Sequence, residues 1–207
     1  MRKRFGVCCI ILGICCLIAA VGFIAYNRWE EEKAQSASRD LLQNVQESIP
    51  DHTREESAAE DGGPDESADT PVEIPQEMPT TKVDGYDCIG VLSIPVLELE
   101  LPVLTDWSYA KLKVAPCHYY GSCYEKDCVI AAHNYRSHFG RLSELRPKDL
   151  ILFTDVSGTV YGYEVVLLET LPGNAREEMI TSGFDLSLYT CTVGGSNRVT
   201  VRCSAVE

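Results

Sequence analysis

An uncharged segment near the N-terminus limits what this chain can fold into more than any other feature. Residues 5–26 are 22 consecutive positions without a charged side chain. At about 1.5 Å of rise per helical residue, this length is enough to cross a hydrocarbon core of about 30 Å. We therefore predict a transmembrane helix that contacts lipid here, and a globular fold only for residues that follow it.

The charges that flank this segment predict its orientation. Arg2, Lys3 and Arg4 precede it, and three glutamates follow at residues 30–32. This bias keeps the N-terminus in the cytoplasm and places the rest of the chain outside a cell membrane that it crosses once. We assign residues 1–27 to the basic end and the anchor. A cleaved secretory signal is the alternative, but its apolar region is usually only about 7–15 residues long.

The next segment, residues 28–82, has the composition of an acidic stalk. Residues 27–87 carry 17 acidic and 5 basic side chains, which account for nearly all of the chain's net charge of -13. Apolar residues at helical spacing, Leu41 and Val45 among them, predict a juxtamembrane helix that ends before Pro50. The residues after Pro50 are rich in proline and acidic side chains, so they bury too little apolar surface to fold.

The remaining residues, 83–207, have the length of one domain. They carry no excess of basic side chains, so we expect no nucleic-acid partner. Their segments are short, rich in β-branched and aromatic residues, and bounded by Gly, Pro, Asn or Asp. We predict strands at 88–94, 99–104, 117–120, 128–132, 149–154, 159–170, 184–191 and 198–205, and helical turns at 107–114, 139–145 and 175–182. Eight strands with few helices predict a mainly β domain folded as a closed barrel.

The stretch LYTCTVGGSNRVTVRC, at residues 188–203, brings a thiol and a guanidinium together. Leu186 and Leu188 alternate with Tyr189 and Cys191, so the cysteine lies on the face of its strand that points away from the apolar core. If TVGGSN closes a hairpin, Arg198 becomes its neighbour at one end of the sheet. This placement is unlike that of an ordinary core cysteine.

A thiol nucleophile also needs a base, because a free cysteine is mostly protonated at neutral pH. His133 ends the apolar run CVIAAH, so it occupies a strand end as Cys191 does, and two strand ends at one rim bring the side chains within reach. A structural histidine is the alternative reading of His133. His118 and His138 lie in loop or edge segments and are weaker candidates, and His52 lies in the predicted stalk.

Three segments of the chain resemble the sortase family. SLYTC followed by Arg198 resembles the family's TLxTC...R signature, and VIAAHNYRSHFGRLSEL resembles its segment with the active-site histidine. IGVLSIPVLELELPV resembles the opening strands of the sortase barrel. The likeness covers residues 86–206 and departs at Ser187, where threonine is usual, and in the short turn after Cys191. That turn leaves Arg202 as an alternative to Arg198, although Arg202 is better explained as one partner of an ion pair.

The resemblance implies an eight-stranded sortase-type barrel and a membrane-anchored cysteine transpeptidase of a Gram-positive-type cell envelope. Its catalytic residues would be His133, Cys191 and Arg198, and Asn134, Thr190 and Thr192 would contact the substrate. His133 would act as an imidazolium that favours the thiolate and then protonates the leaving amine. The thiol would cleave an LPxTG-like sorting motif of a secreted protein through a thioacyl-enzyme. An amine of a peptidoglycan precursor or a pilin lysine would then accept the acyl group.

Five further cysteines follow the anchor and allow another function. With Cys191 they make an even number that could form disulfides outside the cell, as in an adhesion or binding module without catalysis. Their spacing lacks the C-x-x-C pairs of structural zinc sites, so we expect no metal. Calcium could bind acidic residues such as Glu98, Glu100 and Asp106, but surface charge explains these residues equally well, and we expect no cofactor.

Overall fold

The computed structural model describes residues 2–50 and 77–206, with side chains from residue 10 onward. Residues 51–76 of the predicted stalk lie outside the described residues. The helices are α1 (Arg2–Ser48), α2 (Tyr109–Leu112) and α3 (Arg176–Ile180), with short 3-10 turns η2 (Pro95–Leu97) and η3 (Leu142–Glu144). The strands are β1 (Thr81–Val83), β2 (Tyr86–Ile94), β3 (Leu99–Leu104), β4 (Cys117–Tyr120), β5 (Cys128–Ala132), β6 (Leu150–Asp155), β7 (Val160–Pro172), β8 (Leu186–Cys191) and β9 (Asn197–Ala205).

Eight strands close into a barrel, which confirms the predicted fold. Around the barrel the order is β2-β3-β4-β5-β8-β9-β7-β6, and pairing of β2 with β6 closes it. The two closing strands approach tightly at Gly90, which pairs with Asp155. A Cβ on Gly90 would lie 2.1 Å from the Thr154 carbonyl oxygen, so only glycine fits at this point without a shift of the backbone.

The strand predictions agree with the structure to within about two residues at each end. β1 is an addition, which pairs with the first residues of β2 and extends the folded domain across the predicted boundary at residue 83. It has only three residues, which is too short for an alternation pattern to indicate a strand. The predicted helical turns contain α2, η3 and α3.

The barrel encloses the main hydrophobic core. Residues from opposite sides of the barrel meet in it, including Leu92, Ile130, Phe153, Leu188 and Val201. Cys128 and Cys203 belong to the same cluster and are fully buried. They act as small apolar residues, as free cysteines in cores usually do.

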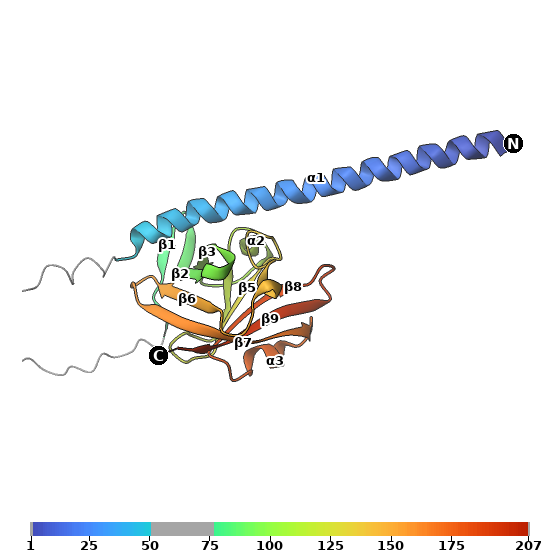
Figure 1. Ribbon diagram of the computed structural model, residues 1–207. Coiled ribbons are helices and arrows are strands. Elements are labelled where there is room, and N and C mark those ends of the chain that lie inside the picture. The colour runs from blue at the N-terminus through green and yellow to red at the C-terminus, as the bar shows by residue number, and fades with distance from the viewer. Residues whose placement is uncertain (1, 51–76, 207) are drawn as a thin grey trace, which may run out of the picture.

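Helix α1 is continuous through the predicted anchor and the predicted juxtamembrane helix. Its N-terminal half projects away from the barrel (Figure 1). From Ile10 onward its most apolar 18-residue window has a mean hydropathy of 2.3 and no buried fraction, so this helix is long and apolar enough to cross a membrane. The sequence prediction of a span is therefore matched by a helix of suitable length.

The C-terminal half of α1 packs on the outside of the barrel. Leu41 and Val45 are buried there in a second, smaller core. Their partners from the barrel and its loops are Cys88, Val91, Leu104, Ala115 and Cys117. The composition of residues 28–49 suggested a spacer, but the structure makes this segment part of the folded unit.

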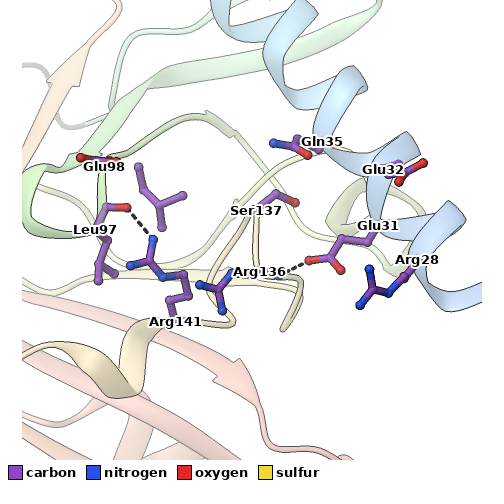
Figure 2. Close-up of a pocket in the computed structure, with 10 residues that line it drawn as sticks. Arg28, Glu31, Glu32, Gln35, Leu97, Glu98, Arg136, Ser137 and Arg141 are labelled. Carbon is purple, nitrogen blue, oxygen red and sulfur yellow. Dashed lines mark hydrogen bonds between the residues drawn. The ribbon is translucent and has the colours of Figure 1, made fainter. Parts of the chain in front are cut away.

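Polar contacts extend this docking along the helix. Glu30 forms an ion pair with Lys113, and the Glu31 carboxylate accepts a hydrogen bond of 2.6 Å from the Arg136 backbone N–H (Figure 2). Near the other end of the contact, Asn44 donates to Asp84 over 2.6 Å. The helix therefore crosses the barrel from the loop after β5 to the turn between β1 and β2.

Candidate active site

The parallel pair β5 and β8 places the predicted histidine and cysteine at one edge of the sheet. Ala132 is the register partner of Thr190, and each is followed by a candidate catalytic residue. His133 and Cys191 therefore leave adjacent strands at the same level, about 4.8 Å apart in the hydrogen-bonding direction. Sequence spacing predicted two strand ends at one rim, and the parallel register brings these ends side by side.

The antiparallel pair β8 and β9 adds the arginine. Cys191 is the register partner of Arg198, as the hairpin prediction required. The Arg198 guanidinium donates to the carbonyl oxygens of Gly195 at 2.9 Å and Asn197 at 3.1 Å. The side chain is thereby held beside the turn that follows the thiol. His133, Cys191 and Arg198 form one row across three neighbouring strands.

Exposure separates Cys191 from the other cysteines of the barrel domain. Cys191 is half-buried, whereas its five counterparts are buried, and all six are free thiols. Burial raises the pKa of the Cys88 thiol to about 11 and those of Cys117 and Cys203 to about 12. These thiols are protonated at neutral pH and shielded from reagents, so Cys191 is the accessible thiol of the barrel.

His133 lies half-buried in the loop after β5. Burial lowers its pKa, the nearby Lys113 ammonium lowers it further, and Glu30 opposes this effect. Its ring lies 4.8 Å from the Tyr135 ring, and its Nε2 atom is buried without a hydrogen-bond partner among the described residues. The lowered pKa favours a neutral imidazole, which can accept a proton from a thiol.

The other two barrel histidines have structural surroundings. His118 is held between the Thr105 carbonyl oxygen at 3.3 Å and the Gly121 carbonyl oxygen at 2.7 Å. His138 is fully buried, and burial together with His133 lowers its pKa to about 4. It is a neutral core residue beneath the His133 loop at neutral pH.

Arg202, the alternative arginine, is occupied elsewhere. It is 1% exposed and forms an ion pair of 2.7 Å with Glu169, as predicted. It also donates to the Met179 and Glu178 carbonyl oxygens and to the Ser187 hydroxyl. Its guanidinium thus joins α3 to strands β7 and β8, and Arg198 remains the arginine opposite Cys191 in the β8–β9 register.

The three predicted substrate contacts have different environments. Thr190 is 3% exposed, and its hydroxyl donates to the Ala132 carbonyl oxygen over 2.8 Å. This bond ties β8 to β5 one residue before the cysteine and histidine. The Thr192 N–H donates to the Asn197 carbonyl oxygen at 3.0 Å and closes the hairpin. Asn134 is exposed beside His133.

A row of aromatic side chains leads to the site. This row was not predicted from the sequence. The Trp107 ring lies 5.8 Å from the Tyr119 ring, and Tyr119 packs edge-on against Tyr189 at 5.4 Å. Tyr189 is two residues before Cys191 on the same face of β8. The outward alternation of Tyr189 was the signal that could have suggested this row, but its partners come from distant loops.

Among residues 2–50 and 77–206 there is no group of three or more His, Cys, Asp or Glu side chains that could hold a metal ion. Two of the acidic residues considered for calcium have protein partners. Asp106 forms an ion pair with Lys111, and Glu100 accepts a hydrogen bond of 2.9 Å from Gln46.

Comparisons with known proteins agree with this fold. The Sortase domain model matches residues 92–206, more than half of the chain, and the chain therefore belongs to the sortase family. No curated protein matches it.

Similar solved structures are also sortases. Sortase A from Corynebacterium diphtheriae is 26% identical with a TM-score of 0.51, over 59% of this chain and 62% of that one. A Streptococcus pneumoniae sortase C, whose structure was reported in connection with pilin substrate specificity, is 26% identical with a TM-score of 0.52. The match covers 61% of this chain and 71% of that one. Sortase C1 from Streptococcus agalactiae is 24% identical with a TM-score of 0.53, and the match covers 61% of this chain and 71% of that one. At this identity it supports the fold alone. The chain spans less than two thirds of the Corynebacterium protein's length.

Proposed function

We propose that this protein is a membrane-anchored cysteine transpeptidase that cleaves an LPxTG-like sorting motif and transfers the acyl part to an amine. The observation that carries the proposal is the row of His133, Cys191 and Arg198 on three adjacent strands. Family membership supports the same chemistry. In this reading Cys191, the one thiol of the barrel that is not buried, is the nucleophile.

The first half-reaction forms a thioester. A ring nitrogen of His133 takes the proton of Cys191, and the sulfur attacks a backbone carbonyl carbon of the bound motif. The tetrahedral intermediate collapses when the C–N bond breaks, and the His133 proton passes to the leaving amine. The lowered pKa of His133 suits this cycle, because the imidazole accepts a proton easily only when it starts neutral.

The second half-reaction releases the product. An acceptor amine attacks the thioester carbon, the C–S bond breaks, and the Cys191 thiolate is regenerated while His133 removes the proton of the attacking amine. In both halves Arg198 supplies a fixed positive charge, whose donors steady the oxyanion or the substrate backbone. Asn134 and the residues around Thr192 border the place where the motif would lie.

The acceptor is either a peptidoglycan precursor or a pilin lysine. The similarity to a sortase C with pilin substrate specificity keeps the pilin route open. The anchor would be residues 5–26 of α1, with the N-terminus in the cytoplasm and the barrel outside the cell membrane. Such a position keeps the enzyme at the surface where exported proteins emerge.

Full-length protein in detergent tests the proposal with quenched fluorescent peptides that carry LPxTG-like motifs. We expect cleavage, a mass increase on Cys191 equal to the acyl fragment, and loss of both in Cys191→Ala. Cys88→Ala, which removes a buried thiol outside the site and keeps Cys191, serves as the matched control and should still form the adduct. The absence of an adduct with every motif, together with paired cysteines in the intact mass, would favour the disulfide-framed binding module.

A further inference from the structure

The part of α1 next to the predicted span is attached to the loops around Cys191. Glu30 pairs with Lys113, which follows α2, and Glu31 binds the Arg136 N–H in the loop after His133. Glu30 is four residues beyond Tyr26, the end of the uncharged segment, and this spacing is about 6 Å along a helix. The headgroup layer on each face of a bilayer is about 5–8 Å thick, so both contacts lie at headgroup level if residues 5–26 span the membrane.

We define the active-site rim as the loops 105–114, 133–140 and 192–196. The rim carries exposed apolar and aromatic side chains close to the thiol. Trp107 is 43% exposed, Tyr109 is 76% exposed, and Val193 at the tip of the β8–β9 hairpin is 96% exposed. Trp and Tyr are the residues most enriched at membrane–water interfaces, where a ring can be half in lipid and half in water.

The docking fixes which way this rim faces. The second core around Leu41 and Val45 holds the barrel on a continuous helix, and the hairpin between β8 and β9 extends toward the N-terminal end of α1 (Figure 1). At this level Arg28 and Arg136 line a cavity of 490 Å³ between the helix and the rim loops, together with Glu31, Glu32 and Glu98 (Figure 2). The cavity is therefore polar and carries charges of both signs.

We infer that the active-site rim rests on the lipid headgroups, with Trp107 and Val193 in the interface, and that the docking of α1 on the barrel holds it there. The inference rests on the proposed membrane anchoring of residues 5–26. A motif would then reach Cys191 within the headgroup layer, at a set depth from the membrane, instead of anywhere along a flexible stalk. The docked helix thus becomes a device that selects substrates by their distance from the bilayer.

The chain offers a direct depth measurement because it contains only two tryptophans, Trp29 and Trp107. Trp29→Phe leaves Trp107 as the single reporter on the rim, and Trp107→Phe leaves Trp29 as a matched reporter just past the span. Each full-length variant is placed in vesicles of phosphatidylcholine and phosphatidylglycerol, with or without bromine on the acyl chains near the headgroup. We expect brominated lipid to quench Trp107 at least half as strongly as Trp29.

A third variant tests the role of the docked helix. Val45→Asp in the Trp29→Phe background places a charge in the second core and should release the barrel, so that the quenching of Trp107 falls several-fold. Near-ultraviolet circular dichroism checks that the barrel remains folded, and the first comparison stands without this variant.

Three results would overturn the inference in distinguishable ways. Quenching of Trp29 without quenching of Trp107 would show an inserted helix with the rim in water. Quenching of neither tryptophan would contradict the proposed anchoring of residues 5–26 as well as the contact between the rim and the lipid. Quenching of Trp107 that is unchanged in a folded Val45→Asp variant would show that docking does not set the position of the rim. Peptide cleavage in detergent is independent of all three, so failure of the transpeptidase proposal would be seen separately.

Discussion

Cys191 of β8 lies directly opposite Arg198 of β9, and the arginine is fastened to the turn between them by two backbone carbonyls. The guanidinium is therefore held at the turn that follows the thiol before any substrate arrives. Arg202, on the same strand, makes its bonds to α3 and the sheet. The two arginines should consequently fail in different ways when they are replaced.

Arg198→Ala should lower kcat/KM by about 10²–10³, the usual cost of removing an oxyanion donor, while Tm stays within a few degrees. Arg202→Ala should instead cost about 1–3 kcal/mol of unfolding free energy, because the Met179 and Glu178 carbonyl oxygens lose their donor. Peptide kinetics and thermal melts of both variants check this contrast. Comparable activity losses in two equally stable variants would contradict the assignment of Arg198.

Cys191 should react faster than the other thiols of the barrel. A charged, membrane-impermeant maleimide added to protein in vesicles should modify it at least about tenfold faster than Cys88, Cys117 or Cys203, whose pKa values are raised by burial. Peptide mapping after timed quenching measures the order of modification. In denaturant the difference should disappear, and early labelling of Cys203 under native conditions would disprove the burial argument.

Thr190 should act as a positioning residue. Thr190→Val keeps the shape but removes the 2.8 Å bond to the Ala132 carbonyl oxygen, and we expect a loss of about 1–3 kcal/mol in unfolding free energy. Because that bond joins β5 and β8 just before His133 and Cys191, kcat should fall while KM changes little. Thr190→Ser keeps the hydroxyl and should restore kcat. A rise in KM alone would indicate direct substrate contact, as the sequence analysis expected.

His138 should make the protein sensitive to acid. Its pKa is about 4 in the folded protein and 6.5 in its ordinary state, so the unfolded chain binds the proton more tightly. Above pH 6.5 His138 is neutral in both states and does not lower the free energy of unfolding. As pH falls from 6.5 toward 4, the free energy of unfolding decreases by about 1.4 kcal/mol per pH unit and by about 3 kcal/mol in total.

His138→Phe removes this titration and keeps an aromatic ring in the core. Urea unfolding of both proteins between pH 7 and pH 4 isolates the effect, because the carboxylates and His133 titrate in each. We expect the variant to lose about 3 kcal/mol less over this range. Parallel pH curves for the two proteins would show that His138 is not the responsible group.

Local patterns predicted the strands well because alternation, turn residues and β-branched side chains act over a few neighbours. These local patterns were enough to predict the hairpin that joins Cys191 to Arg198. They also predicted the strand end at His133. The pairing of β5 with β8 could not be derived from spacing, since it joins residues 58 positions apart, as the Thr190 to Ala132 bond shows. Their positions at strand ends suggested that His133 and Cys191 lie at one rim, and the family resemblance then implied a shared catalytic role.

The docking of α1 was missed for a related reason. The apolar positions around Leu41 and Val45 predicted a helix, but the acidic composition of residues 28–49 suggested a solvated spacer. Whether an amphipathic helix packs on a neighbour depends on a matching apolar surface, here Val91, Leu104 and Cys117, which exists only after β2, β3 and β4 are assembled. The partners of Arg202 in α3 are likewise a product of tertiary packing.

The parallel contact between β5 and β8 also determines when, during folding, Cys191 gains its histidine neighbour. A newly made chain carries Cys191 and His133 on segments separated by a long loop, whose closure costs entropy that only the finished barrel offsets. Until that closure the thiol has no neighbouring imidazole and behaves like any other cysteine. Catalytic competence therefore reports complete assembly, and half-folded molecules cannot form stray acyl bonds with their neighbours.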